Sequence, residues 1–469
     1  MSIYLIFVLV YLGALIFVGA TKARAIASQS DFALAGRGLG TFVLTGTLLA
    51  TWMGTGSIFG NSAEAFRVGF PSFVIPLAGG TGIFCLIFLA TRVQNQNNFT
   101  IQDILERSFG PASRIIGTIT LTLAYVIIVS YQYRAGAAIV EKLAPDLPHV
   151  WAVIFMAVFV ILYTVLAGMY SVAYTDVVNG LIMIVGFIIV VPFLLSKAGG
   201  ISGVIHSLET SQRSFTGHYS LGELISILLP SLLLILGDAN LYGRFFSAKS
   251  PEAAKKSAKY MLASVLFMEW IILFTAIIGL ALVNQGVIAT PSNPGHIVVD
   301  IAYNVLPPFL GALMMATIMA IVVSTADSYL LAPGSAIVRD MYQRFFKPEA
   351  TDKQLVLVSR ITVAALGLIA LAMAFMSDKF FSISLFAYTL YGASITPALL
   401  GALFWKKVNY HAGTISMVVG LLTALIWKFL QTKEMLPQAI VDMGIDAVLP
   451  AALLSTIVLV TITWFKQKS

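Results

Sequence analysis

One short stretch, IVVSTADSYLL at residues 321–331, places oxygen-bearing side chains inside an otherwise apolar part of the chain. Positions i, i+3, i+4 and i+7 of a helix share one face. The residues at these positions are Ile321, Ser324, Thr325 and Ser328, with Asp327 beside them. Carbonyl, hydroxyl and carboxylate oxygens without histidine or thiol suit an alkali cation better than a transition metal. The alternative is that the hydroxyls only bond to carbonyls of their own helix.

The elements that must position these residues are membrane-spanning helices. The chain has 469 residues, of which 59% are hydrophobic and 10% charged, and its mean hydropathy is +0.92. A soluble domain of this size would not tolerate that composition, whereas a helix needs roughly 20 apolar residues to cross a bilayer. We count 13 such stretches, among them 149–168 and 173–196. The sequence therefore predicts an all-α integral membrane protein with 13 transmembrane helices.

The formal net charge of +7 is explained by topology rather than by nucleic-acid binding. Most basic residues fall on one side of the membrane if the N-terminus is outside and the C-terminus cytoplasmic, which is the positive-inside rule. We therefore expect a multi-pass protein of the plasma (inner) membrane. Cys85 is the only cysteine of the chain, so no internal disulfide is expected.

Two apolar segments are interrupted by polar, glycine-bearing sequence, at ATWMGTGSIFG (50–60) and at LGDANLYG (236–243). Broken helices in corresponding positions of two halves indicate an inverted repeat whose unwound backbones line a substrate and ion site. Unpaired backbone groups are tolerated in a bilayer only where protein, water or a ligand satisfies them. The alternative for the glycines alone is close helix packing.

The breaks divide the chain into two halves of five spans each. The predicted units are a first peripheral helix and loop at 1–37, repeat 1 at 38–197, repeat 2 at 198–408 and two peripheral helices at 409–469. Because each repeat has an odd number of spans, the second is inserted upside down relative to the first.

Acidic residues inside apolar spans are functional candidates, because a charge there costs at least ~2.5 kcal/mol unless it is partnered. Asp176, Asp238, Glu269 and Asp327 are such residues, and Glu269 is given no specific role. No lysine lies mid-span to neutralise them, and Arg134 is the one basic candidate. A bound cation is the simplest expected partner, and a proton on Asp327 or Asp238 is the alternative.

At these residues the chain resembles the sodium/solute symporter family. The motifs that support the resemblance are AGRGLG (35–40), ATWMGTGSIFGNSAEAF (50–66), LYTVLAGMYSVAYTDVV (162–178), VVSTADS (322–328) and RDMY (339–342). They are similar above all to the high-affinity choline transporter branch, and more distantly to bacterial proline symporters. The resemblance implies the leucine-transporter architecture, with a 5+5 inverted repeat and discontinuous helices.

The resemblance also implies two sodium sites. The principal site would be formed by backbone carbonyls of Ala50, Met53 and Ile321 and by the hydroxyls of Ser324 and Thr325. The second site, known in some members, falls on Asp176, Ser324 and Ser328, with Asp327 at a position that is serine in those members. The additional carboxylate leaves two alternatives, a strengthened second sodium site or a proton site.

For the solute, Trp52 matches the tryptophan of the choline transporters that packs on a quaternary ammonium, a cation–π contact worth ~0.5–2 kcal/mol. Two other tryptophans of that cage fall on Asp238 and near Ile128, so choline itself is in doubt. Trp52 and Asp238 would suit another solute with a positive nitrogen, and Thr51 and Tyr133 complete the candidate substrate residues. The alternatives are that Trp52 is a packing residue and that Asp238 caps a helix.

The sequence therefore predicts a transporter and not an enzyme: a Na+-coupled symporter that works by alternating access on a small organic solute. The expected partners are this solute, sodium ions and the lipid bilayer, with a monomer as the functional unit and no nucleic acid. A proton-coupled transporter of the same fold is the alternative. A membrane sensor or a channel is a further alternative of a different class.

Overall fold

The computed structural model describes residues 2–23, 28–215, 218–375 and 380–468. Within them the regular secondary structure is helical, apart from an isolated backbone bridge between Leu39 and Ala248. The α-helices are α1 (Ile3–Ala23), α2 (Gln29–Leu34), α3 (Thr41–Trp52), α4 (Ser62–Val68), α5 (Ile75–Asn95), α6 (Ile101–Phe109), α7 (Pro111–Leu143), α8 (His149–Lys197), α9 (Gly200–Ser207), α10 (Thr210–Arg213), α11 (Leu221–Gly237), α12 (Ala239–Phe246), α13 (Pro251–Asn284), α14 (Ile297–Asn304), α15 (Pro308–Ala336), α16 (Asp352–Met373), α17 (Phe380–Phe404), α18 (Ala412–Thr432), α19 (Gln438–Asp442) and α20 (Val448–Lys468).

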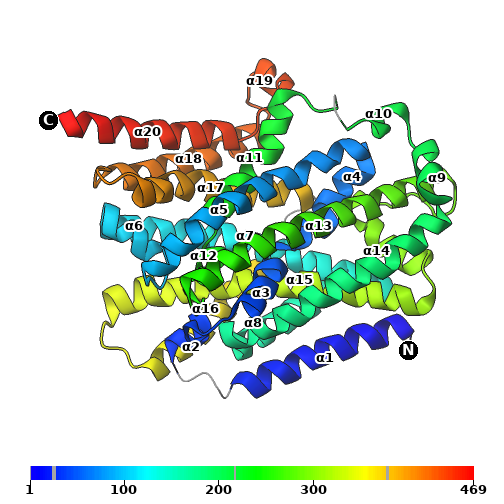
Figure 1. The fold of residues 1–469 in the computed structure, drawn as a ribbon, viewed down its shortest axis with the longest axis horizontal. Coiled ribbons are helices and arrows are strands. Elements are labelled where there is room, and N and C mark those ends of the chain that lie inside the picture. Colours follow the sequence, from blue (N-terminus) through cyan, green and yellow to red (C-terminus); the bar gives the residue numbers. More distant parts are fainter. Residues whose placement is uncertain (1, 24–27, 216–217, 376–379, 469) are drawn as a thin grey trace.

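The long helices run roughly along one common direction, and the two ends of the chain lie at opposite ends of this bundle (Figure 1). Helix α1 lies along one edge, where it packs on α8 and α15, and α18 and α20 lie along the opposite edge. Helix α15 is almost entirely buried between α7 and α8. The apolar helix that carries Ser324 and Asp327 is therefore the centre of the fold.

The number of membrane crossings predicted from the sequence is not confirmed. The described residues contain 10 helices that are long and apolar enough to span a membrane, or 11 if the bent pair at Thr41–Trp52 and Gly56–Val68 is one span. Two features account for the difference. The apolar part of α1 is only Ile3–Val18, and α8 is one continuous element of 49 residues where two spans, at 149–168 and 173–196, were expected.

Helix α8 would be about 73 Å long if it were straight, more than twice the ~30 Å of a hydrocarbon core. It is interrupted at Gly168, whose φ of 56° and ψ of 175° are not helical. A positive φ of this kind is readily adopted only by glycine. Gly168 therefore divides α8 into two segments at the place where the sequence analysis separated the two spans.

Both predicted breaks are present. Helix α3 ends at Trp52, Met53 is extended with φ −70° and ψ 106°, and the chain resumes as a π-helical turn, η2 (Gly56–Asn61), that leads into α4. The two parts of this segment are bent by 51°. Helix α11 ends at Gly237, Asp238 is extended with φ −62° and ψ 113°, and α12 follows.

The two broken segments are joined at one end through their backbones. The Leu39 N–H donates to the Ser247 carbonyl at 3.0 Å, and the Lys249 N–H donates to the Leu39 carbonyl at 2.9 Å. Leu39 precedes α3, and Ser247 to Lys249 follow α12. The start of the first broken segment is thus tied to the end of the second.

Candidate ion and substrate site

The end of α3 and the middle of α15 bring five oxygen atoms together. The Ser324 hydroxyl lies 3.2 Å from the carbonyl oxygens of both Ala50 and Ile321. The Thr325 hydroxyl lies 2.7 Å from the Met53 carbonyl oxygen and 3.5 Å from that of Ala50. All five residues are buried, with exposed fractions of 3% or less. The structure therefore brings together every residue predicted for the principal cation site.

The termination of α3 explains why these carbonyls are available. The last carbonyls of a helix have no intrahelical donors, and they form the negative end of the helix dipole. Neither Ala50 nor Met53 receives a backbone hydrogen bond from the residues of the break, since the Ser57 N–H donates to Gly54 instead. Their carbonyls meet the hydroxyls of α15, and this set of neutral oxygens fits an alkali cation. The described residues contain no group of three His, Cys, Asp or Glu side chains that could hold a metal.

Gly54 allows the break to approach α15 closely. A Cβ atom at this position would lie 2.8 Å from Cγ2 and 2.9 Å from Oγ1 of Thr325. Gln132 of α7 supports the other side of the break, because its side-chain carbonyl accepts hydrogen bonds from both the N–H and the hydroxyl of Thr55. The glycine at position 54 thus lets the break contact α15, the helix that carries the hydroxyls of Ser324 and Thr325.

The predicted second site contains a cation of the protein itself. The buried carboxylate of Asp176 accepts a 2.6 Å hydrogen bond from the Thr47 hydroxyl and lies 3.5 Å from Nη2 of Arg244. The same Nη2 donates to the Ser328 hydroxyl at 2.8 Å. The expectation that Arg134 is the one basic partner available inside the spans was wrong. Arg244 lies near the end of an apolar stretch in the sequence, but α12 returns its side chain to the interior, where it is 0% exposed.

Asp327 belongs to the same cluster. Its Oδ1 accepts a 3.2 Å hydrogen bond from the hydroxyl of Ser328, and its Oδ2 has no hydrogen-bond partner among the described residues. The Thr51 hydroxyl, expected at the solute, lies 3.4 Å from the Ser328 hydroxyl. The structure thus places Thr51 with the acids and Arg244, on the side of α3 that also carries Thr47.

Asp238 forms a helix cap, which is the alternative that the sequence analysis left open. Its Oδ1 accepts hydrogen bonds from the backbone N–H groups of Asn240 and Leu241, at 2.7 and 3.2 Å. The hydroxyls of Tyr125 and Tyr329 donate to its two carboxylate oxygens at 2.9 Å each. These four donors surround the carboxylate and fix the start of α12.

Trp52 has a different acidic neighbour, which the sequence analysis left without a role. Glu269 of α13 is 4% exposed, lies close to the Trp52 side chain, and accepts hydrogen bonds from Ser57 Oγ at 2.6 Å and Asn61 Nδ2 at 3.0 Å. Tyr388 of α17 lies on the same side, with its ring centroid 6.4 Å from that of Trp52. Unlike Asp176, Glu269 forms no ion pair with a described residue.

Tyr133, the last of the residues predicted to bind the solute, does not lie near Trp52, Glu269 and Tyr388. Its hydroxyl lies near Gly367 of α16. The distance from this hydroxyl to a Cβ atom built on Gly367 would be 3.3 Å. Tyr131, two residues earlier, lies close to Tyr388 instead. Residues 131 and 133 therefore lie on different sides of α7, and only the first is associated with Trp52.

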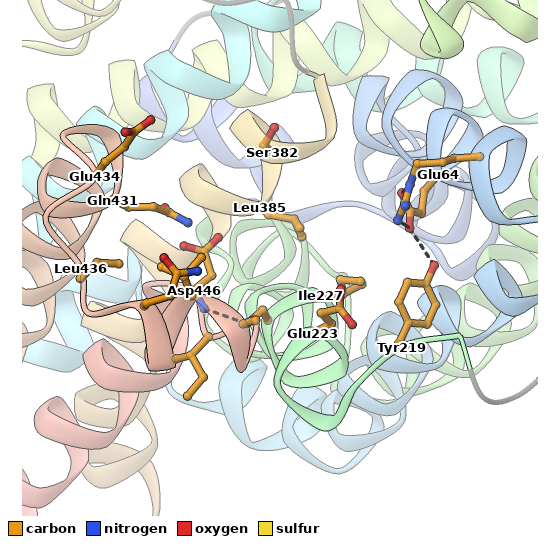
Figure 2. A pocket seen from close by; sticks show the side chains of 16 residues that line it. Glu64, Tyr219, Glu223, Ile227, Ser382, Leu385, Gln431, Glu434, Leu436 and Asp446 are labelled. Carbon is orange, nitrogen blue, oxygen red and sulfur yellow. Dashed lines mark hydrogen bonds and ion pairs between the residues drawn. The ribbon is translucent and has the colours of Figure 1, made fainter.

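A cavity of ≈ 630 Å³ opens between α4, the first turns of α11, the start of α17 and residues 431–446. Its charged lining residues are Glu64, Arg67, Glu223, Glu434 and Asp446. Figure 2 shows Tyr219 directed at Glu64, to which it donates a 2.9 Å hydrogen bond. Burial and the Glu64 carboxylate raise the pKa of Tyr219 above its usual value, so the hydroxyl remains a donor. The excess of acids over bases favours cations in this cavity.

A bundle of membrane-spanning helices with two broken segments, each at a buried polar cluster, defines a membrane transporter. The family model for the sodium:solute symporter family matches residues 32–420. The chain belongs to this family, so its activity is Na+-coupled symport of a small organic solute.

Both transporter branches to which the motifs are similar occur among the relatives. The chain is 26% identical to the sodium/proline symporter of Escherichia coli (strain K12), over 89% of this chain and 86% of that protein. It is 28% identical to the human high affinity choline transporter 1, over 82% of this chain and 69% of that protein.

Solved structures show the same fold. A Na+-coupled sialic acid symporter in a substrate-bound outward-open state superposes with a TM-score of 0.85 at 16% identity, over 99% of this chain and 98% of that one. The nucleobase-cation-symport-1 family transporter Mhp1 superposes with a TM-score of 0.61 at 15% identity, over 93% and 95% of the two chains. The predicted leucine-transporter fold is confirmed.

Proposed function

We propose that the coupling Na+ ion binds among the carbonyl oxygens of Ala50, Met53 and Ile321 and the hydroxyls of Ser324 and Thr325. The observation that supports this assignment is the convergence of these five oxygens, in which each of the two hydroxyls lies 2.7–3.5 Å from two of the carbonyl oxygens. The ion would join the end of α3 to α15 and so order the break that carries Trp52. Bound sodium would thereby increase the affinity of the protein for the solute. Bound solute would increase the affinity for sodium by the same factor.

We further propose that the solute carries a positively charged nitrogen. Trp52 offers an aromatic face, and Glu269 offers a buried carboxylate without an ion-pair partner beside it. Proline and choline, which the relatives' names mention, both contain such a nitrogen. The acidic cavity would concentrate cations on the way to this site. Glu269 is therefore the acid that we propose for binding the positive nitrogen, a role that the sequence analysis gave to Asp238.

The proposed cycle follows from these two sites. Sodium and solute bind from outside, residues 38–197 and 198–408 rock against each other, and the site opens to the cytoplasm. We propose that the protein lies in the plasma (inner) membrane as a monomer, with the N-terminus outside. A membrane potential of 100 mV would contribute ~2.3 kcal/mol for each charge moved fully across.

A thermal-shift screen of the purified protein tests the proposal. Amines, amino acids, guanidines, sugars and carboxylates are each added in NaCl and in KCl at one fixed pH. We expect a nitrogen cation to raise the apparent melting temperature, and to raise it more in NaCl, because a ligand that binds the folded state stabilises it. Stabilisation that is equal in both salts would contradict sodium coupling. Stabilisation only by sugars or carboxylates would contradict the solute class.

A further inference from the structure

We propose that a small cavity beside the second break is the closed start of the route by which Na+ leaves toward the cytoplasm, and that Gln102 and Asn240 bind the ion on this route. The inference rests on the proposed function, because it assumes that Na+ enters from outside and is released inside. The cavity, named here the exit cavity, has a volume of ≈ 40 Å³. It is lined by the start of α6, by α12 and by the C-terminal part of α15, together with single residues of α2, α7 and α8.

The exit cavity lies on the inner side of the proposed ion site. Helix α15 carries first Ser324 and Ser328 and then Leu331, which lines the exit cavity. Positions i, i+4 and i+7 share one helix face, and seven residues correspond to about 10 Å along a helix. The large acidic cavity is lined by α4, which lies toward the end of the bundle that carries the N-terminus, whereas α6 lies toward the other end (Figure 1). With the N-terminus outside, the end that carries α6 is cytoplasmic.

The side chains of Gln102 and Asn240 bring unpaired polar atoms to the exit cavity. Both residues are 1% exposed. Oε1 and Nε2 of Gln102 and Oδ1 and Nδ2 of Asn240 have no hydrogen-bond partner among the described residues. A buried amide is costly without hydrogen bonds, and such groups are normally bonded to protein or to water. A volume of ≈ 40 Å³ is enough for a water molecule, and a Na+ ion is no larger. The exit cavity is therefore a polar site that its own side chains leave incomplete.

The chemistry of these two amides suits an ion in transit. Their side-chain carbonyls are neutral, hard oxygen ligands, which suit Na+. An ion on a conducting route must bind strongly enough to enter and weakly enough to leave, and a neutral amide meets this requirement better than a buried carboxylate does. Asn240 is also linked to the buried charges, because its backbone carbonyl accepts a 3.3 Å hydrogen bond from Nη1 of Arg244, whose Nη2 donates to Ser328.

A group of ion pairs closes the exit cavity on its cytoplasmic side. Arg114 of α7 is 5% exposed and pairs with Asp103 of α6 and, at 3.1 Å, with Asp340 of η5 (Ile337–Phe346). Thr100 lines the exit cavity, and its hydroxyl donates to the same Asp340 oxygen at 2.9 Å. These contacts hold α6, α7 and the end of α15 together beside the cavity. The route opens when they break.

The closure is tested by 22Na+ flux into proteoliposomes that contain the full-length protein, with sodium outside and no solute. We expect Arg114→Met to raise the flux about tenfold or more above that of the wild type, because removing one partner of a buried ion pair is strongly destabilising. Arg107→Met is the matched control and should leave the flux unchanged. Arg107 is an exposed arginine of α6 outside the ion pairs of Arg114.

The two amides are tested in the opened protein. Gln102→Met or Asn240→Leu, each added to Arg114→Met, should return the flux to the wild-type level, because an apolar side chain of similar size offers the ion no ligand. Gln29→Met is the matched control and should keep the flux high. Gln29 is a buried glutamine of α2 whose Nε2 also has no partner among the described residues, and it lies outside the exit cavity.

The outcomes separate this inference from the proposed function. Wild-type flux in Arg114→Met would overturn the closure by ion pairs, and undiminished flux in the double variants would overturn the role of the amides. Equilibrium binding of 22Na+ to the purified wild type is measured alongside, and no bound sodium would contradict the proposed function itself. If Arg114→Met does not fold, Asp340→Asn takes its place, because it weakens the same ion pair without leaving an unpaired acid.

Discussion

The hydroxyl of Thr325 lies 2.7 Å from the backbone carbonyl oxygen of Met53, although 271 residues separate the two in the chain. This contact joins the extended residue at the end of α3 to the central helix α15. It can form only because α3 stops at Trp52 and leaves its last carbonyls without helical donors. The principal ion site is therefore a property of two helices together.

Ser324→Ala and Thr325→Ala should each raise the sodium concentration needed for half-maximal uptake. Each substitution removes one oxygen ligand, and a loss of about 1.4 kcal/mol in sodium binding corresponds to a tenfold change. Uptake of solute into proteoliposomes at varied external Na+ measures the effect. Ser335→Ala is the control, because Ser335 lies in the same helix without a side-chain hydrogen bond to a described residue. Unchanged sodium dependence in both site variants would count against the assignment.

Gly54→Ala should weaken sodium binding without removing any ligand. The new Cβ would lie 2.8 Å from Thr325 Cγ2, so α15 and the break would have to separate. We expect a reduction in sodium affinity of about tenfold, since overpacking typically costs 1–3 kcal/mol. Gly243→Ala in α12 is the matched control, because a Cβ there meets no atom within 4 Å. Equal sodium affinities in the two variants would show that the close approach at Gly54 is unimportant.

Glu269→Gln should weaken solute binding and leave sodium binding nearly unchanged. The amide keeps the size of the side chain but removes the charge, and a hydrogen bond to a charged group contributes about 1.5–3 kcal/mol. We therefore expect the solute concentration for half-maximal uptake to rise about tenfold or more. Glu252→Gln is the control, because Glu252 is an exposed acid on the same helix. An unaffected solute affinity would refute the role of Glu269.

Asp238→Ala should destabilise the fold, and Asp238→Asn should do so much less. Alanine removes the cap of α12 and leaves the hydroxyls of Tyr125 and Tyr329 without their acceptor. The expected cost is on the order of 2 kcal/mol, whereas asparagine still caps well. The apparent melting temperature in detergent measures the difference. Solute affinity lost in Asp238→Asn at unchanged stability would instead support direct contact with the solute.

The sequence alone determined the membrane-spanning helical class, because mean hydropathy and apolar length depend on composition and not on packing. It also located both helix breaks, since Gly54, Gly56 and Gly237 lie in polar interruptions of apolar segments. The family motifs pointed to the five residues of the principal site, and the structure brings them together. The breaks and the motifs are local features, because each lies within a few consecutive residues.

Only the tertiary structure decided which charges meet. Asp176, Asp238 and Glu269 are all acids inside apolar segments, and nothing in the sequence distinguishes their partners. In the fold the first meets Arg244, the second caps α12 under two tyrosine hydroxyls, and the third lies beside Trp52. The partner of a buried charge is set by contacts between distant helices. Their packing, and not their individual sequences, fixes the distances on which electrostatic interactions depend.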